Sequence, residues 1–277
     1  MDLSFERRGS GAPLVLLHGI GSRWQAFEPV LDALAASFDV WAVDLPGMGA
    51  SAAPPSPIGS IGELTDLVWA WMDEHGLDGA HVAGNSTGGG VALELASRGV
   101  VASACGLAPI GFWSRRERMW CQASIRNTRA SSRLMRPLAP ALAGSRVART
   151  LMLSQYVAKP WVLDPGDVVG DIDALIGAPS FDDVSAAFTG YVAPADAADR
   201  VPVTIAWGDK DRLLLPRQAR RAQRLLPRAR HVLLPGCGHL MMSDDPAAVA
   251  GVVRSAATAP AAAAVGAGAA VPAPSGS

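Results

Sequence analysis

The chain has 277 residues, 49% of them hydrophobic, and a formal net charge of −1. This length allows one large domain with a sizeable core, and the charge gives no reason to expect a nucleic acid or an anionic membrane as partner. Three cysteines, Cys105, Cys121 and Cys237, have no metal-ligand spacing, and their odd number argues against a disulfide framework. We also find no signal-peptide pattern and no membrane-spanning apolar run, so we expect a cytoplasmic protein without a membrane partner.

Short apolar segments alternate with longer amphipathic segments along most of the chain. We expect strands at residues 14–17, 40–43, 81–83, 100–107, 203–207 and 231–234. We expect helices at residues 24–37, 61–75, 87–98, 217–226 and 246–254. Such alternation is typical of an α/β fold, in which crossover helices cover both faces of a mostly parallel sheet.

This alternation stops between residues 112 and 200. Seven arginines and one glutamate occur in residues 115–136, whereas residues 164–199 contain eight aspartates and no Lys, Arg or Glu. We interpret residues 112–200 as an inserted helical segment, here termed the cap, and residues 1–111 and 201–255 as the core that it interrupts. Residues 256–277 are almost entirely Ala, Pro, Gly, Val and Ser, which predicts a disordered tail.

Four cap arginines have helical spacing, namely Arg126, Arg129, Arg133 and Arg136. One interpretation is a docking face for an acidic partner, such as a carrier protein that delivers an acyl thioester. The aspartates within the same insertion favour the other interpretation, a solvated face whose charge is balanced inside the cap. We therefore disfavour a carrier-protein partner at this stage and expect a small-molecule partner.

The sequence around Ser86 carries the strongest chemical signal. Ser86 is the central residue of Gly84-Asn85-Ser86-Thr87-Gly88, between an expected strand and an expected helix. G-x-S-x-G in this context predicts a sharp strand-to-helix turn that exposes the serine hydroxyl as a nucleophile. A glycine-rich loop, His18-Gly19-Ile20-Gly21, follows an earlier strand, and the backbone N–H groups of Ile20 and Thr87 could form an oxyanion hole.

Two further motifs follow strands near the end of the chain. They are Gly208-Asp209-Lys210-Asp211 and Gly236-Cys237-Gly238-His239. A serine hydroxyl needs an imidazole to accept its proton, and that imidazole needs a carboxylate to orient it. We therefore predict His239 as the general base, with an aspartate from the preceding turn as its partner. No metal ion or cofactor is required by this chemistry.

Taken together, these motifs and Asp44-Leu45-Pro46-Gly47-Met48-Gly49 resemble the α/β-hydrolase superfamily, in its capped esterase-like branch, over roughly residues 3–255. The resemblance implies a mostly parallel sheet of about eight strands, a helical cap after strand six, and no cofactor. It implies the triad Ser86, Asp211 and His239, because the family's acid lies three residues after the glycine. The N-terminal strands look short, so we expect a trimmed first hairpin.

The expected activity is hydrolysis of a small carboxylic ester through an acyl-serine. The same triad could act on a thioester, a lactone or a carbon–carbon bond, and a non-catalytic binding protein on this scaffold is the alternative from another class. Cap and loop side chains often line a substrate pocket. The candidates are Trp113, Trp120, Tyr156, Trp161 and Met241.

Overall fold

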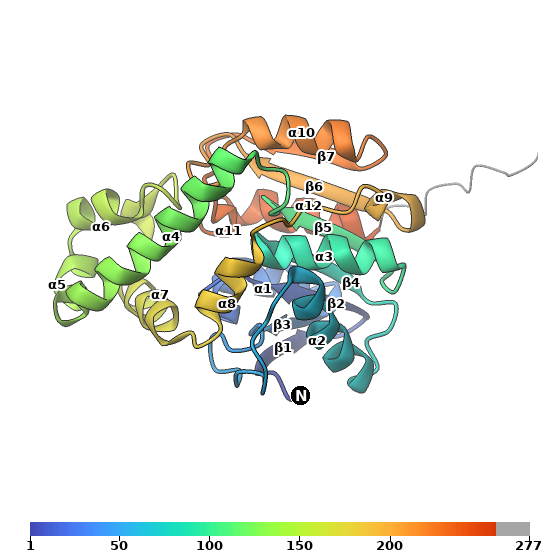
Figure 1. Cartoon of the computed structure of the whole chain (residues 1–277), viewed down its shortest axis with the longest axis horizontal. Helices are drawn as coiled ribbons and strands as arrows, with labels where there is room; N and C mark the ends of the chain where they lie inside the picture. Colours follow the sequence, from blue (N-terminus) through green and yellow to red (C-terminus); the bar gives the residue numbers. More distant parts are fainter. Residues whose placement is uncertain (259–277) are drawn as a thin grey trace, which may run out of the picture.

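The fold is built on a sheet whose strands run in the order β1-β3-β2-β4-β5-β6-β7, and the computed structural model describes residues 1–258 (Figure 1). Among the described strands, only β1 is antiparallel to its neighbour. The strands are β1 (Phe5–Gly9), β2 (Ala12–Leu17), β3 (Phe38–Val43), β4 (His81–Asn85), β5 (Ser103–Leu107), β6 (Val203–Gly208) and β7 (Arg230–Leu234). The expected fold class is confirmed.

The strand count among residues 1–258 is seven rather than about eight, since β1 alone precedes β2. This difference agrees with the expected trimming of the first hairpin. β1 has no counterpart among the expected strands, because Phe5 is its only large apolar residue and the strand lies at the sheet edge. In contrast, β6 is buried along its whole length and β2 from Leu14 to Leu17, and both are mainly apolar, as strands covered on both faces should be.

Helices cover both faces of the sheet. α3 and α12 each contact β4 and β5 from opposite sides, α2 packs beside α3, and α1 packs beside α12. The expected helix at 24–37 is divided into a 3-10 turn and α1, where Pro29 occupies the first turn of the α-helix. The core helices are η1 (Trp24–Phe27), α1 (Glu28–Ala35), α2 (Ile61–Glu74), α3 (Thr87–Arg98), α10 (Arg217–Leu225), α11 (Met241–Asp244) and α12 (Pro246–Ala257).

Between β5 and β6 the chain forms further helices, most of which extend to one side of the sheet, whereas the last, α9, packs against α3 (Figure 1). The first begins at Ser114, whose side chain and that of Glu117 cap each other's backbone N–H groups. These helices are α4 (Arg115–Met135), η2 (Arg136–Leu138), α5 (Ala139–Gly144), α6 (Arg146–Leu153), η3 (Pro160–Val162), α7 (Pro165–Gly177), α8 (Phe181–Ala187) and α9 (Ala197–Arg200).

The cap has a small apolar cluster of its own and internal ion pairs. Buried members of this cluster are Ala139, Ala143, Val168 and Ile172. Arg129 pairs with Asp182, and Arg136 pairs with Asp173. Two of the four helically spaced arginines are thus neutralised within the cap.

The C-terminal end of the described chain is helical. α12 continues to Ala257, so it overlaps the first two residues of the tail that we expected to begin at residue 256. Residues 259–277, which make up most of that predicted tail, lie outside the described residues. Within residues 1–258, no helix combines the length and the apolar character needed to cross a bilayer.

Candidate active site

Ser86 occupies a strained turn between β4 and α3. Its φ of 55° and ψ of −112° lie outside the regions that residues with a side chain ordinarily adopt. A Cβ atom added to Gly84 would collide with the backbone of Gly88, and one added to Gly88 would collide with the carbonyl group of Leu17. The glycines on either side of Ser86 are therefore required for this close approach of strand and helix, as the motif predicts.

Two backbone N–H groups beside Ser86 have no hydrogen-bond acceptor within the described chain, those of Ile20 and Thr87. Thr87 is the first residue of α3, where the helix leaves its N–H groups unsatisfied. Gly88 N–H donates to the carbonyl oxygen of His18 at 3.1 Å, which joins the Ile20 loop to the start of α3. This arrangement suits the stabilisation of an oxyanion.

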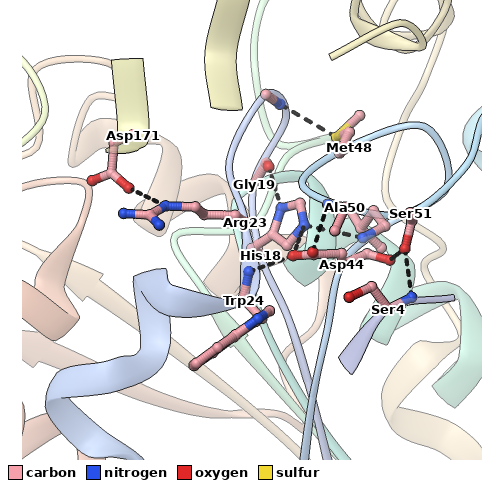
Figure 2. A network of polar contacts seen from close by, with 12 residues as sticks. Ser4, His18, Gly19, Arg23, Trp24, Asp44, Met48, Ala50, Ser51 and Asp171 are labelled. Atoms are coloured by element: carbon pink, nitrogen blue, oxygen red, sulfur yellow. Dashed lines mark hydrogen bonds and ion pairs between the residues drawn. The ribbon is translucent and has the colours of Figure 1, made fainter. Parts of the chain in front are cut away.

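A polar network around the buried side chains of His18 and Asp44 supports the Ile20 loop (Figure 2). Asp44 accepts hydrogen bonds from Trp24 N–H at 2.6 Å and Ala50 N–H at 2.8 Å, so it ties the turn together. His18 Nδ1 lies 2.7 Å from the carbonyl oxygen of Gly19, and His18 Nε2 accepts a hydrogen bond from Leu45 N–H. Burial lowers the pKa of His18, which keeps the ring neutral, and we assign it a structural role.

The loops after β6 and β7 bring Asp211 and His239 into contact. His239 Nδ1 lies 2.8 Å from Asp211 Oδ2, and both side chains are buried. The other oxygen, Asp211 Oδ1, accepts from the N–H groups of Leu213 and Leu214 at 2.9 and 2.8 Å. Asp209 instead accepts from Gly236 N–H at 2.6 Å, so of the two aspartates in this turn only Asp211 contacts the imidazole.

Ser86 and His239 line the same cavity, although their side chains form no hydrogen bond with each other within residues 1–258. Such contacts often tighten only when substrate binds. Asn85 Nδ2 donates to the carbonyl oxygens of His239 at 3.1 Å and Leu107 at 3.0 Å, which connects the nucleophile's turn to the histidine loop. Asn85 was not among the predicted site residues, although it is adjacent to Ser86 in the motif.

The cavity has a volume of about 400 Å³ and is mainly apolar. Its floor comes from the core, with Ile20, Ser86, Leu213, His239 and Leu240. Its walls come from the cap helices and the segments between them. The larger wall residues are Ile125, Met135, Leu142, Met152, Leu153, Tyr156, Leu163, Val168, Ile172 and Leu175. This volume and character are typical of a small-molecule site.

Residues 14–252 match the family model described as "Alpha/beta hydrolase family", which is most of the chain. The chain belongs to the alpha/beta hydrolase family. One relative is the dihydrolipoyllysine-residue acetyltransferase component of an acetoin cleaving system from Pseudomonas putida. The two sequences are 28% identical over 254 residues, which cover 87% of this chain and 62% of that protein.

The chain is also similar to the pimeloyl-[acyl-carrier protein] methyl ester esterase of Aeromonas hydrophila, at 40% identity over 96 residues, or 35% of this chain and 36% of the esterase. The chain therefore spans less than two thirds of the length of each of these curated relatives. A solved thermophilic esterase from Thermogutta terrifontis shares the fold, with a TM-score of 0.70 at 21% identity, over 91% of this chain and 92% of that one.

Of the expected pocket residues in this hydrolase-family site, the structure places Tyr156 on the cavity wall, where its hydroxyl lies 2.6 Å from Thr128 Oγ1. Met241 is buried in the main core instead, and Trp113 packs against Phe188. Trp120 and Trp161 are both about half exposed and lie away from the cavity. An aromatic residue in a cap segment has no sequence signal that tells which way it faces.

Asp244 is a second residue that the sequence analysis missed. Its buried carboxylate accepts hydrogen bonds from Gly238 N–H at 2.7 Å, Ala158 N–H at 2.9 Å and Lys159 N–H at 2.8 Å. It thereby fixes the loop that carries His239 against the cap segment that carries Tyr156. Within residues 1–258, no group of three or more His, Cys, Asp or Glu side chains could hold a metal ion.

Proposed function

We propose that this chain is a serine hydrolase that cleaves a carboxylic ester of modest size, with a largely apolar acyl group, through an acyl intermediate on Ser86. The observation that carries the proposal is the Asp211–His239 hydrogen bond at the cavity that also holds the strained Ser86. Asp211 would keep His239 in the tautomer whose Nε2 accepts a proton.

In the first half of the reaction, Ser86 Oγ attacks the ester carbonyl carbon while its proton passes to His239 Nε2. The carbonyl electron pair moves onto the oxygen, which receives hydrogen bonds from Ile20 N–H and Thr87 N–H. The tetrahedral intermediate collapses, and the leaving alkoxide takes the proton from His239. Water then attacks the acyl-serine with His239 again as base, which releases the acid and restores Ser86.

The cavity supports an apolar acyl group, because its wall is formed mainly by aliphatic cap residues. The esterase named among the relatives supports an ester over a lactone or a carbon–carbon bond. The strained backbone at Ser86 supports a functional role for this turn, because such strain persists mainly where function requires it. The three cysteines are buried and free, which fits the cytoplasm that we expect.

A fluorophosphonate probe tests this assignment. We expect stoichiometric labelling of the wild type at Ser86 and none of Ser86→Ala, whose kcat on a short-chain aryl ester should fall by about 10⁶. Ser243→Ala is the matched control, because Ser243 lines the same cavity and should be dispensable for labelling. Labelling that persists in Ser86→Ala would exclude Ser86 as the nucleophile.

A further inference from the structure

The outer part of the cap exposes large apolar side chains that no other element among residues 1–258 covers. Leu134, Val147 and Leu151 are 83%, 70% and 79% exposed, and Leu138, Trp161 and Val162 are about half exposed or more. Val147 and Leu151 lie one turn apart on α6, so they share a face. η3, which carries Trp161 and Val162, packs against α6, and η2, which carries Leu138, contacts α5 beside it.

Charge in this part of the chain has one sign. Between Glu117 and Asp164 the sequence contains seven arginines and one lysine, but no aspartate or glutamate. Arg126, Arg133 and Arg146 are exposed and form no ion pair within residues 1–258. Arg133 directly precedes Leu134, and Arg146 directly precedes Val147. We call these three arginines and the six apolar residues above the outer cap surface.

The helices beneath the outer cap surface also form the wall of the cavity. On α6, Met152 and Leu153 line the cavity, whereas Val147 and Leu151 do not. Leu142 of α5 and Met135 at the end of α4 line it as well. One thin layer of helices therefore separates the exposed apolar residues from the space above Ser86.

We propose that the outer cap surface docks on anionic lipid bilayers at their interface, without crossing them. Exposed aliphatic and tryptophan side chains beside arginines are the combination that inserts into the headgroup region of an anionic membrane. Self-association through this face would bring the arginines of two copies together. An acidic protein could pair with the arginines, but it would not account for the highly exposed aliphatic side chains beside them. The net charge of −1 conceals this run of arginines, because aspartates later in the chain, from Asp164 onward, offset it in the sum.

Vesicle flotation tests the proposal with two kinds of vesicle, phosphatidylcholine alone and equal parts of phosphatidylcholine and phosphatidylglycerol. We expect the full chain to bind the anionic vesicles, more weakly at high salt, and Ser86→Ala to bind equally well. Binding by Ser86→Ala separates this proposal from the proposed catalytic function. The double variant Val147→Ser/Leu151→Ser should weaken partitioning by about tenfold or more, because the apolar groups that insert are lost.

Arg133→Gln/Arg146→Gln should weaken binding to anionic vesicles by about fivefold for each arginine. The matched controls are Val192→Ser, an exposed aliphatic residue outside this surface, and Arg224→Gln, an exposed arginine of α10, which should bind like the wild type. Absence of vesicle binding would overturn the proposal, as would binding that the two double variants leave unchanged. Binding of poly-glutamate without vesicle binding would instead assign an acidic protein partner. Dimerisation that Val147→Ser/Leu151→Ser abolishes, without vesicle binding, would assign a second copy.

Discussion

The core and the cap bury their side chains in different ways. The core packs seven strands between helices around fully buried large residues such as Trp71, Trp207 and Phe27. Phe181 and Phe188 of the cap also belong to this main cluster. The outer part of the cap buries only a small separate cluster of Ala, Val and Ile side chains, and supplements it with arginines that donate to carboxylate and carbonyl oxygens. Arg129 donates to Asp182 and to the carbonyl of Ala178, and Arg149 donates to the carbonyl of Trp161.

This difference separates the chemistry from substrate selection. Ser86, Asp211 and His239 all extend from the carboxyl ends of core strands, where dense packing holds them in place. The wall that a substrate would touch comes mostly from the cap, whose separate apolar cluster is small. Substitutions in the core should therefore abolish catalysis or folding, whereas substitutions in the cap should alter which substrates are accepted.

The largest effect should come from the core carboxylate that contacts His239. Asp211→Asn should retain the fold but lower kcat by about 10⁴, because an amide favours the wrong histidine tautomer. Asp209→Asn, the matched control in the same turn, should change kcat by less than about tenfold, since its carboxylate accepts only from Gly236 N–H and pairs with Lys210. Steady-state kinetics on one ester would compare them, and the reverse order would reassign the acid to Asp209.

A pair of valines measures the packing difference directly. Val91 on α3 and Val168 on α7 are both buried in helices, the first in the core and the second in the cap cluster. Val91→Ala should lower the free energy of unfolding by about 2–3 kcal/mol, and Val168→Ala by about 1 kcal/mol, because the smaller cluster can relax into the space. Urea unfolding followed by circular dichroism provides both values. Equal losses would show that the cap is packed as tightly as the core.

Glu117 makes one of the polar contacts at the boundary between the two regions. It lies in the first turn of α4 of the cap and accepts hydrogen bonds from Arg217 and Arg221 of α10 in the core. Burial by itself would raise the pKa of Glu117, but the hydrogen bonds from Arg221, the Ser114 backbone and Arg217 outweigh it and lower the pKa to about 2. The ionised carboxylate therefore stabilises the folded state.

We expect Glu117→Gln to lower the free energy of unfolding by about 2 kcal/mol at neutral pH. Because the folded pKa is depressed from 4.5 to about 2, the loss should be full above about pH 4.5 and should shrink as pH falls toward 2. Urea unfolding at several pH values measures it. Glu74→Gln, at an exposed site that contacts only the N-terminal amine, should show little change at any pH. A loss that did not depend on pH would contradict a role for the charge.

The sequence alone determined the parts of this protein that depend on local backbone geometry. The elbow at Ser86 needs glycines at positions 84 and 88. These lie two residues before and two residues after the serine, so the sequence shows them directly. The buried strands are visible as short apolar runs, and α3 occupies the expected residues 87–98. β1 was not predicted, because an edge strand exposes many of its side chains and therefore has few apolar residues.

The tertiary structure decided everything that depends on the direction of a side chain. Asp209 and Asp211 share one turn, and only the approach of the β7 loop selects Asp211 as the partner of His239. Tyr156 faces the cavity, whereas Met241 is buried in the core, and no local pattern distinguishes them. Asp244 fixes the histidine loop through backbone groups 85 and 86 residues earlier in the chain. Contacts at such separations arise from packing of the whole chain, so they leave no periodic signal in its sequence.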